Sequence, residues 1–338
     1  MNAKNSVRRK LTALMMALLT GLAAVVGAPQ ASAANRDWLR PDSTGHCEWD
    51  RVGFWVQRCT VWSPAMNRHI TVQIQPAQRG GNAGLYMLDG LRATEITNAW
   101  VNDVNAARTF KDNNITLVMP VGGQSSFYTD WNAPATYDFN HPVTYKWDTF
   151  LTKELPPYLQ RNFGVSPTRN SIVGLSMGGT AAMNLAAWHR NQFKQATSLS
   201  GYLNPTWPGM YAGIQYAMND AAKGANIWDM WGSPVDPRSF RNDPTVQAGR
   251  FRGMPLYLAA SGGVPSRGEK FLENPRGVAA GIGLEWMART STAKFEMAAR
   301  AVGARPVVSY PMTGLHAWPY WDAELSKARP HILRALGA

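Results

Sequence analysis

The sequence has few cysteines and no long apolar run beyond its amino terminus. Cys47 and Cys59 are the only cysteines among 338 residues, which excludes a dense disulfide framework. No segment after residue 33 approaches the roughly 20 apolar residues that span a bilayer, so we expect no transmembrane anchor after processing. Internal repeats and low-complexity tracts are also lacking. With 45% hydrophobic residues the chain can bury one large core, and we expect one catalytic domain that needs no metal or cofactor.

The first 33 residues have the features of a secretory signal peptide. Basic residues within 4–10 precede an apolar run over 11–26, and the small-residue site Ala31-Ser32-Ala33 follows. The sequence after Arg8-Arg9 fits the twin-arginine pattern poorly, which favours ordinary secretion. We therefore expect cleavage after Ala33 and a location in the cell envelope or outside the cell.

Export to an oxidising space favours a disulfide between Cys47 and Cys59. The bond would close a short loop in an amino-terminal extension, residues 34–65, ahead of a catalytic domain over 66–338. Such a loop stabilises by about 2 to 3 kcal/mol in the chain-entropy model, so it would secure a hairpin and leave the main core independent. Two unpaired buried thiols are the alternative.

The charge is basic but dispersed. The formal net charge is +12, and removal of the first 33 residues with their four cations leaves +8. Nucleic acid is a poor partner for an exported protein whose Lys and Arg residues form no single run. A negatively charged envelope surface is the expected partner, although a merely solvated surface explains the charge equally well.

Short apolar runs alternate with helical stretches, which predicts a mostly parallel sheet covered by helices on both faces. The clearest helix covers residues 177–189. Residues from about 202 to 252 are rich in Trp, Met, Gly and Pro and are expected to form an insertion, used either for packing or to line an apolar channel. The expected strands are 70–75, 85–88, 115–121, 171–175, 196–199, 256–260 and 307–310.

The segment Gly174-Leu175-Ser176-Met177-Gly178 matches the G-x-S-x-G nucleophile motif. It follows a predicted strand and opens a predicted helix, which is the context that the motif requires in an α/β-hydrolase fold. The sequence therefore predicts Ser176 as a nucleophile whose oxyanion is stabilised at the helix amino terminus, by Met177. A second oxyanion amide is expected from Leu91, within Asp89-Gly90-Leu91-Arg92, although an ordinary Asp-Gly turn is the alternative.

The base and the acid must follow Ser176 in the chain, in the order acid and then histidine. His316 comes just after the last predicted strand and is the expected base, whereas His331 lies in a helical stretch and is explained by packing. The remaining histidines, His46, His69, His141 and His189, come before the expected acid and are given structural roles. The acid is expected between the strand over 256–260 and His316, and the residue types alone do not choose among the four glutamates there, which are Glu269, Glu273, Glu285 and Glu296.

Several motifs together resemble the antigen 85 mycolyltransferases, in particular their corynebacterial-type relatives. The resemblance extends from about residue 66 to the carboxyl end. The motifs are LDGLRA over 88–93, MPVGGQSSFYTDW over 119–131, YKW over 145–147, TFLT over 149–152, GLSM over 174–177, DMWG over 229–232, NDP over 242–244 and HAWPYW over 316–321.

The resemblance implies transfer of a mycoloyl group from trehalose monomycolate to a second one, or to arabinogalactan. It assigns the acid to Glu285, although the string over 271–274 resembles the mycobacterial sequence around the catalytic glutamate and keeps Glu273 as a rival. It also implies that Asp89, Arg92 and Trp318 bind trehalose. A secreted esterase with water as the acceptor and a silent envelope-binding protein are the alternative functions.

Overall fold

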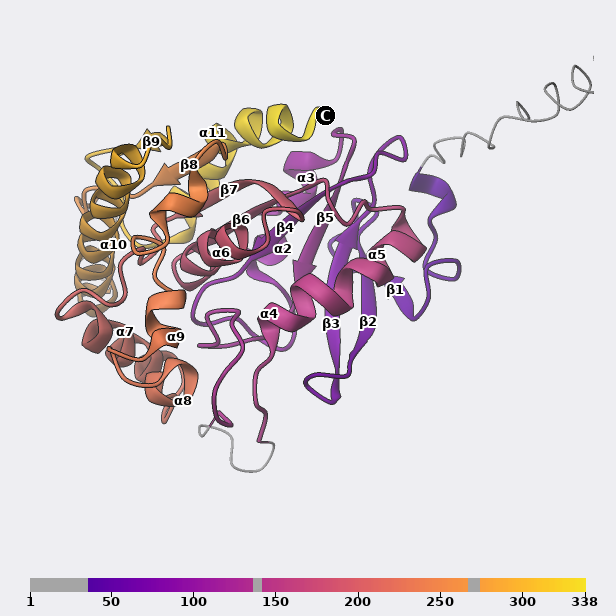
Figure 1. Cartoon of the computed structure of the whole chain (residues 1–338). Helices are drawn as coiled ribbons and strands as arrows, with labels where there is room; N and C mark the ends of the chain where they lie inside the picture. The colour runs from indigo at the N-terminus through magenta and orange to yellow at the C-terminus, as the bar shows by residue number, and fades with distance from the viewer. Residues whose placement is uncertain (1–35, 136–141, 267–273) are drawn as a thin grey trace, which may run out of the picture. The chain divides into compact units, whose positions relative to one another are not determined.

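One mixed sheet organises the protein, whose computed structural model describes residues 36–135, 142–266 and 274–338. The nine strands of these residues lie in the order β1-β2-β3-β5-β4-β6-β7-β8-β9 (Figure 1). The first three neighbour pairs are antiparallel and every later pair is parallel. The strands are β1 Cys47–Trp49, β2 Gln57–Ser63, β3 Arg68–Gln75, β4 Ala83–Leu88, β5 Ile115–Pro120, β6 Asn170–Leu175, β7 Phe193–Leu199, β8 Leu256–Ala259 and β9 Val307–Ser309.

The central strands carry apolar side chains on both faces, as expected for parallel strands covered by helices. On β4, Tyr86 and Leu88 pack in one hydrophobic cluster, whereas Leu85 and Met87 pack in the other. Helices α5, α6 and α10 contribute to the first cluster, and α2, α3 and α11 to the second. The predicted α/β-hydrolase architecture is thus confirmed, with helices on both faces of the sheet.

The helical elements connect successive strands, and the predicted helix over 177–189 corresponds to α6. The elements outside the insertion are η1 Arg36–Trp38, α2 Ala99–Asn102, α3 Ala106–Phe110, α4 Trp147–Thr149, the π-helical turn η2 Phe150–Glu154, α5 Leu155–Phe163, α6 Met177–Trp188, α10 Pro275–Ala301 and α11 Trp318–Leu336. No helix of the described segments is both long and apolar enough to cross a membrane.

The Trp- and Met-rich segment lies between β7 and β8 and is mostly helical. It comprises α7 Met210–Ala221, α8 Ile227–Trp231, α9 Pro237–Arg241 and the short 3-10 helix η3 Ala248–Phe251. Met218, Met230 and Trp231 are fully buried, whereas Trp207 and Trp228 are each 54% exposed. Most of this segment therefore packs against the core, and among its helices only α7 also borders the large cavity described below.

The amino-terminal hairpin is continuous with the main sheet. Cys47 and Cys59 are directly opposite each other on β1 and β2 and form the expected disulfide. Cys59 is fully buried in the first hydrophobic cluster, and β2 pairs with β3 over its whole length. The described part of the segment 34–65 thus belongs to the same compact unit as the following strands, whereas the expected signal peptide, residues 1–33, lies outside the described residues.

Candidate active site

Ser176 occupies a strained turn between β6 and α6. Its backbone has φ +50° and ψ −120°, a left-handed region that a non-glycine residue rarely adopts. A Cβ at position 174 would lie 2.1 Å from the Gly178 carbonyl oxygen, and one at position 178 would lie 2.4 Å from the Asp89 carbonyl oxygen. Both positions of the motif therefore require glycine, because neighbouring backbone atoms leave no room for a side chain. The turn places Ser176 at the carboxyl edge of the sheet.

The imidazole of His316 bridges Ser176 and Glu285. Its Nε2 lies 2.9 Å from Ser176 Oγ, and its Nδ1 lies 2.9 Å from Glu285 Oε2. A carboxylate only accepts hydrogen bonds, so Nδ1 carries the proton and Nε2 accepts from the serine hydroxyl. This chain of hydrogen bonds can remove the proton of Ser176 when its oxygen attacks a carbonyl.

Glu285 is 1% exposed and fully hydrogen-bonded. Besides His316, its carboxylate accepts from the Ser261 N–H at 2.6 Å, the Ser261 hydroxyl at 2.9 Å and the Ser200 hydroxyl at 2.9 Å. Burial by itself raises the pKa of Glu285, but these hydrogen bonds and the neighbouring imidazole outweigh it and bring the pKa below the usual value. The carboxylate is therefore charged at neutral pH.

Four residues that were not predicted from the sequence surround the hydrogen-bonded series of Ser176, His316 and Glu285. Ser200 and Ser261 hold Glu285, and Trp321 donates its indole N–H to the Ser200 hydroxyl at 3.0 Å. Tyr202 stacks on the His316 ring, with centroids 6.0 Å apart and planes 23° apart. The positions of Ser200 and Ser261 in the chain could have indicated this role. They come just after β7 and β8, at the same edge of the sheet where Ser176 follows β6.

The two expected oxyanion donors lie close to Ser176. Met177 is the first residue of α6, so the helix provides no acceptor for its N–H. Leu91 lies in the loop after β4 and lines the same cavity as Ser176. Two backbone amides at these positions can stabilise the negative charge of a tetrahedral intermediate.

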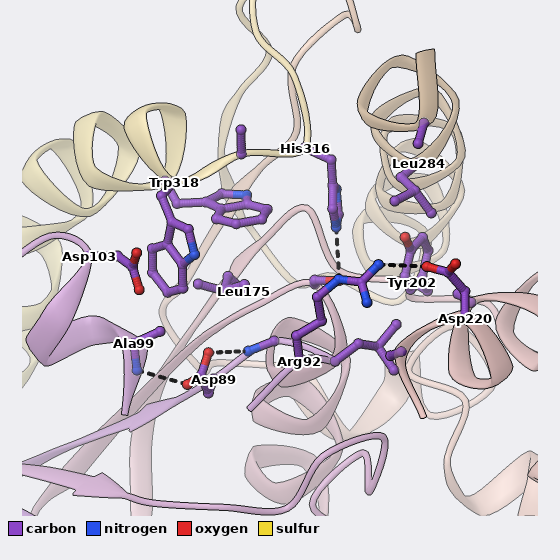
Figure 2. Close-up of a pocket in the computed structure, with 18 of the residues that line it drawn as sticks. Asp89, Arg92, Ala99, Asp103, Leu175, Tyr202, Asp220, Leu284, His316 and Trp318 are labelled. Carbon is purple, nitrogen blue, oxygen red and sulfur yellow. Dashed lines mark hydrogen bonds and ion pairs between the residues drawn. The ribbon is translucent and has the colours of Figure 1, made fainter. Parts of the chain in front are cut away.

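Ser176 and His316 open on a cavity of about 1190 Å³ that has two chemically different ends. One end carries polar residues from the loop after β4 and from α2, including Thr94, Thr97 and Asn102. The other end lies between α7 and α10 and carries mostly small or apolar residues, with Asp220 as the one charged residue that these two helices contribute. Figure 2 shows Asp89, Asp103 and Trp318 on one side of His316, with Leu284 and Asp220 on the other. The apolar end is lined by Gly213, Ala217, Ala221, Ala280, Gly283, Leu284 and Met287.

Asp89 is almost completely buried at the polar end. Its carboxylate accepts from the Ala99 N–H at 2.8 Å and from the Gly90 N–H at 2.7 Å (Figure 2). Burial raises the pKa of Asp89 to about 6, against the opposing effect of these two bonds. A carboxylate in this position can accept hydrogen bonds from the hydroxyls of a bound sugar.

The other expected sugar-binding residues also line the cavity. Arg92 forms an ion pair with Asp220 of α7, with 2.5 Å between Nη2 and Oδ2 (Figure 2). Trp318, at the start of α11, packs edge-on against Trp100 and Trp321 at centroid distances of 5.4 and 5.2 Å. The structure thus brings Asp89, Arg92 and Trp318 to one cavity with Ser176, although Arg92 has a partner of its own.

The remaining candidates lie away from the site or outside the described residues. His331 packs against Tyr257, and Glu296 accepts from Tyr310 and Arg300. The residues Glu269 and Glu273 lie outside the described residues, as does His141. The described part of the chain contains no group of three or more His, Cys, Asp and Glu side chains arranged to hold a metal ion. Of the other histidines, His189 bonds to Asp148, His69 packs against Trp62, and His46 is exposed.

Comparisons with known proteins identify the relatives of this chain. The esterase family model matches residues 63–332. The diacylglycerol acyltransferase/mycolyltransferase Ag85C of Mycobacterium leprae is 37% identical over 99% of this chain and 94% of its own length. Ag85B of Mycolicibacterium smegmatis is 39% identical over 98% of this chain and 96% of its own length. These alignments extend beyond residues 66–338, where the motifs lie.

Solved structures support the same fold. The crystal structure of Mycobacterium tuberculosis MPT51 (FbpC1) has a TM-score of 0.72 and 30% identity, and covers 83% of this chain and 98% of its own. An S-formylglutathione hydrolase from Agrobacterium tumefaciens has a TM-score of 0.60 at 16% identity, over 86% of this chain and 99% of its own, and supports the fold alone. From sequence, fold and site geometry together, the chain belongs to the Ag85 diacylglycerol acyltransferase/mycolyltransferase family of esterase-like α/β-hydrolases.

Proposed function

We propose that this protein is a secreted mycolyltransferase that takes a mycoloyl group from trehalose monomycolate and passes it to a second trehalose monomycolate or to arabinogalactan. The observation that carries the proposal is the hydrogen-bonded chain from Ser176 through His316 to Glu285 at a cavity with one polar and one apolar end. A glycolipid likewise has a polar part, the sugar, and an apolar part, the long acyl chain. The family membership rests on the comparisons, whereas the substrates and the secretion of this protein are proposed here.

The reaction proceeds through an acyl-enzyme. Ser176 Oγ attacks the ester carbonyl while His316 Nε2 takes its proton, and the charge of Glu285 stabilises the resulting imidazolium. The N–H groups of Leu91 and Met177 hold the oxyanion. When the ester C–O bond breaks, His316 returns the proton to the departing trehalose oxygen. The acceptor hydroxyl then repeats these steps in reverse, and Ser176 is regenerated.

The cavity accounts for the choice of substrate. Asp89, Arg92 and Trp318 offer charged hydrogen-bonding groups and an aromatic surface to the trehalose hydroxyls and rings. The gap between α7 and α10 accepts the acyl chain, because its lining is mostly small and apolar and its one charged residue, Asp220, is paired with Arg92. The basic mature chain suits a negatively charged cell envelope.

The test is mass spectrometry of the products formed from trehalose monomycolate. The enzyme should yield trehalose dimycolate and free trehalose, and it should acylate an added arabinogalactan fragment. Free mycolic acid as the main product would identify an esterase. No turnover and no reaction of Ser176 with a serine-directed phosphonate would favour a silent envelope-binding protein.

A further inference from the structure

Helix α10 has an outward face without a charged residue. Six positions recur at intervals of three and four residues, so they lie on one side of the helix. The two large side chains among them, Trp286 and Met297, are 64% and 73% exposed. We call this face the α10 stripe; it consists of Ala279, Gly283, Trp286, Thr290, Ala293 and Met297.

The charged residues of α10 all lie elsewhere. Arg289 stacks on Tyr310, and Lys294 lies 3.5 Å from the ring centroid of Trp207. Glu285 points inward to His316, and Glu296 pairs with Arg300 at 2.7 Å. A helix on a water-exposed surface normally carries its charges on the outer face. Here the stripe stays uncharged for roughly five turns, and Arg276 and Arg300 come only beyond its two ends.

The α10 stripe is continuous with the apolar end of the cavity. Gly283 and Trp286 belong to the stripe and also line the cavity. Tyr216 of α7 lines the cavity as well and is 77% exposed. An acyl chain that leaves the cavity between α7 and α10 would therefore emerge beside this exposed apolar surface.

We propose that the α10 stripe and Tyr216 dock the enzyme on a lipid surface, from which the acyl chain enters the cavity. This inference rests on the proposed function and adds a partner to the same site. Tryptophan and tyrosine suit this position, because an apolar body with a polar tip is stable at a lipid–water boundary. A helix with one apolar face can lie in the plane of that boundary.

A lipid surface fits the stripe better than a second copy of the chain does. The stripe is roughly 27 Å long and about 10 Å wide, given the rise of a helix and its diameter. Two such faces would bury far less than the roughly 1,200 Å² that a stable protein interface needs. Binding to a lipid layer does not require so large a buried area, because shallow insertion of a few apolar side chains contributes to binding.

The experiment is flotation of the mature protein with phosphatidylcholine vesicles, which carry no net charge, in 0.15 M and 0.5 M salt. The protein should float with the vesicles at both salt concentrations, because screening weakens charge attraction but not apolar burial. Met297→Glu and Thr290→Glu should each lower the partition coefficient at least tenfold, because a carboxylate is costly to bury in lipid. Neither residue lines the cavity, so the loss would be an effect of the stripe itself.

The control is Trp62→Glu, on β2 toward the opposite edge of the sheet, where the tryptophan is 47% exposed. This variant should bind vesicles as well as the parent, and melting curves should show that all three variants are folded. Ser176→Ala should also float normally, which separates docking from acyl transfer. Undiminished binding by both stripe variants, or binding lost in 0.5 M salt, would overturn the proposal. So would a dimer in sedimentation velocity that dissociates in Met297→Glu.

Discussion

Arg92 and Asp220 form an ion pair that joins the loop after β4 to helix α7 at the edge of the cavity. Both side chains are largely exposed, at 69% and 59%, so water screens the pair. An exposed pair of this kind contributes at most about 1 kcal/mol to stability. The pair therefore matters more for the position of the Arg92 guanidinium than for the fold.

Replacing Arg92 should thus affect substrate binding rather than stability. We expect Arg92→Ala to raise KM for trehalose monomycolate roughly tenfold, the effect of losing about 1.4 kcal/mol of hydrogen bonding to a charged group. Asp220→Asn is the matched control, because it removes the pair but keeps the guanidinium. Steady-state kinetics and melting curves of both variants test this. An equal rise in KM for both would mean that the pair, and not Arg92 alone, shapes the site.

Removing the acid of the triad should reduce turnover strongly. Glu285→Gln keeps the shape but loses the charge that orients and stabilises the imidazolium, so we expect kcat to fall by about 10² to 10⁴ with little change in KM. Glu296→Gln, on the same helix but bonded to Tyr310 and Arg300, should retain activity. The alternative assignment of the acid to Glu273 is tested with Glu273→Gln. If kcat falls strongly in that variant and is unchanged in Glu285→Gln, Glu285 is not the acid.

Covalent labelling should identify the nucleophile. A lipophilic phosphonate should add to one residue of the protein, and Ser176→Ala should abolish the adduct, because no other hydroxyl is bonded to the imidazole of His316 in the described residues. Intact-mass and peptide mass spectrometry measure this directly. Persistence of a single adduct in Ser176→Ala would refute the assignment.

The buried carboxyl of Asp89 should make stability fall as the pH rises from about 4 to 6. Burial raises its pKa in the folded state from 3.8 to about 6. Between these values the folded protein binds more proton than the unfolded chain, so unfolding becomes easier with increasing pH. Asp89→Asn lacks this titration. The stability of the parent relative to that variant should therefore decrease by about 2 kcal/mol over this window, out of about 3 kcal/mol for the complete titration.

Unfolding of both proteins by urea at several pH values provides the measurement. The difference should level off above about pH 7, when Asp89 is ionised in both the folded and the unfolded state. A constant difference between pH 4 and 7 would show that the pKa of Asp89 is not raised.

Reduction of the disulfide should destabilise the protein without inactivating it at moderate temperature. The Cys47–Cys59 bond closes a loop with a sequence separation of 12, and the loss should be about 2 to 3 kcal/mol. Neither cysteine lines the cavity. Thermal melting and activity with and without reductant test this, and complete loss of activity below the melting transition would contradict it.

Much of the fold follows from local sequence signals. All seven strands expected from apolar runs are present. The signal is clearest in the middle of the sheet, where every residue of β4 and β5 is buried and most are apolar. A hairpin around Cys47 and Cys59 was expected, but its strands β1 and β2 were not among those seven. In β2, polar residues such as Gln57 and Ser63 occupy buried positions. Their partners, Thr44 for Gln57 and Glu154 for Ser63, lie elsewhere in the chain, and no local pattern indicates them.

The site was predictable only where chain order and motif context restrict the choice. Ser176 and His316 follow from the nucleophile motif and the order of the triad. Glu285 required a family resemblance, because four glutamates satisfy the same order. Ser200 and Ser261 acquire their roles only when β7 and β8 bring their ends together beside Glu285. Contacts of this kind depend on the assembled sheet.

Glu285 and Trp286 are adjacent in α10, yet one faces the triad and the other faces outward. A rotation or shift of this helix therefore moves both side chains together. Any partner that favours one position of the helix also favours one arrangement of Glu285 and His316. By thermodynamic reciprocity, the factor by which such a partner changes the affinity of the site for a ligand is also the factor by which that ligand changes the affinity for the partner.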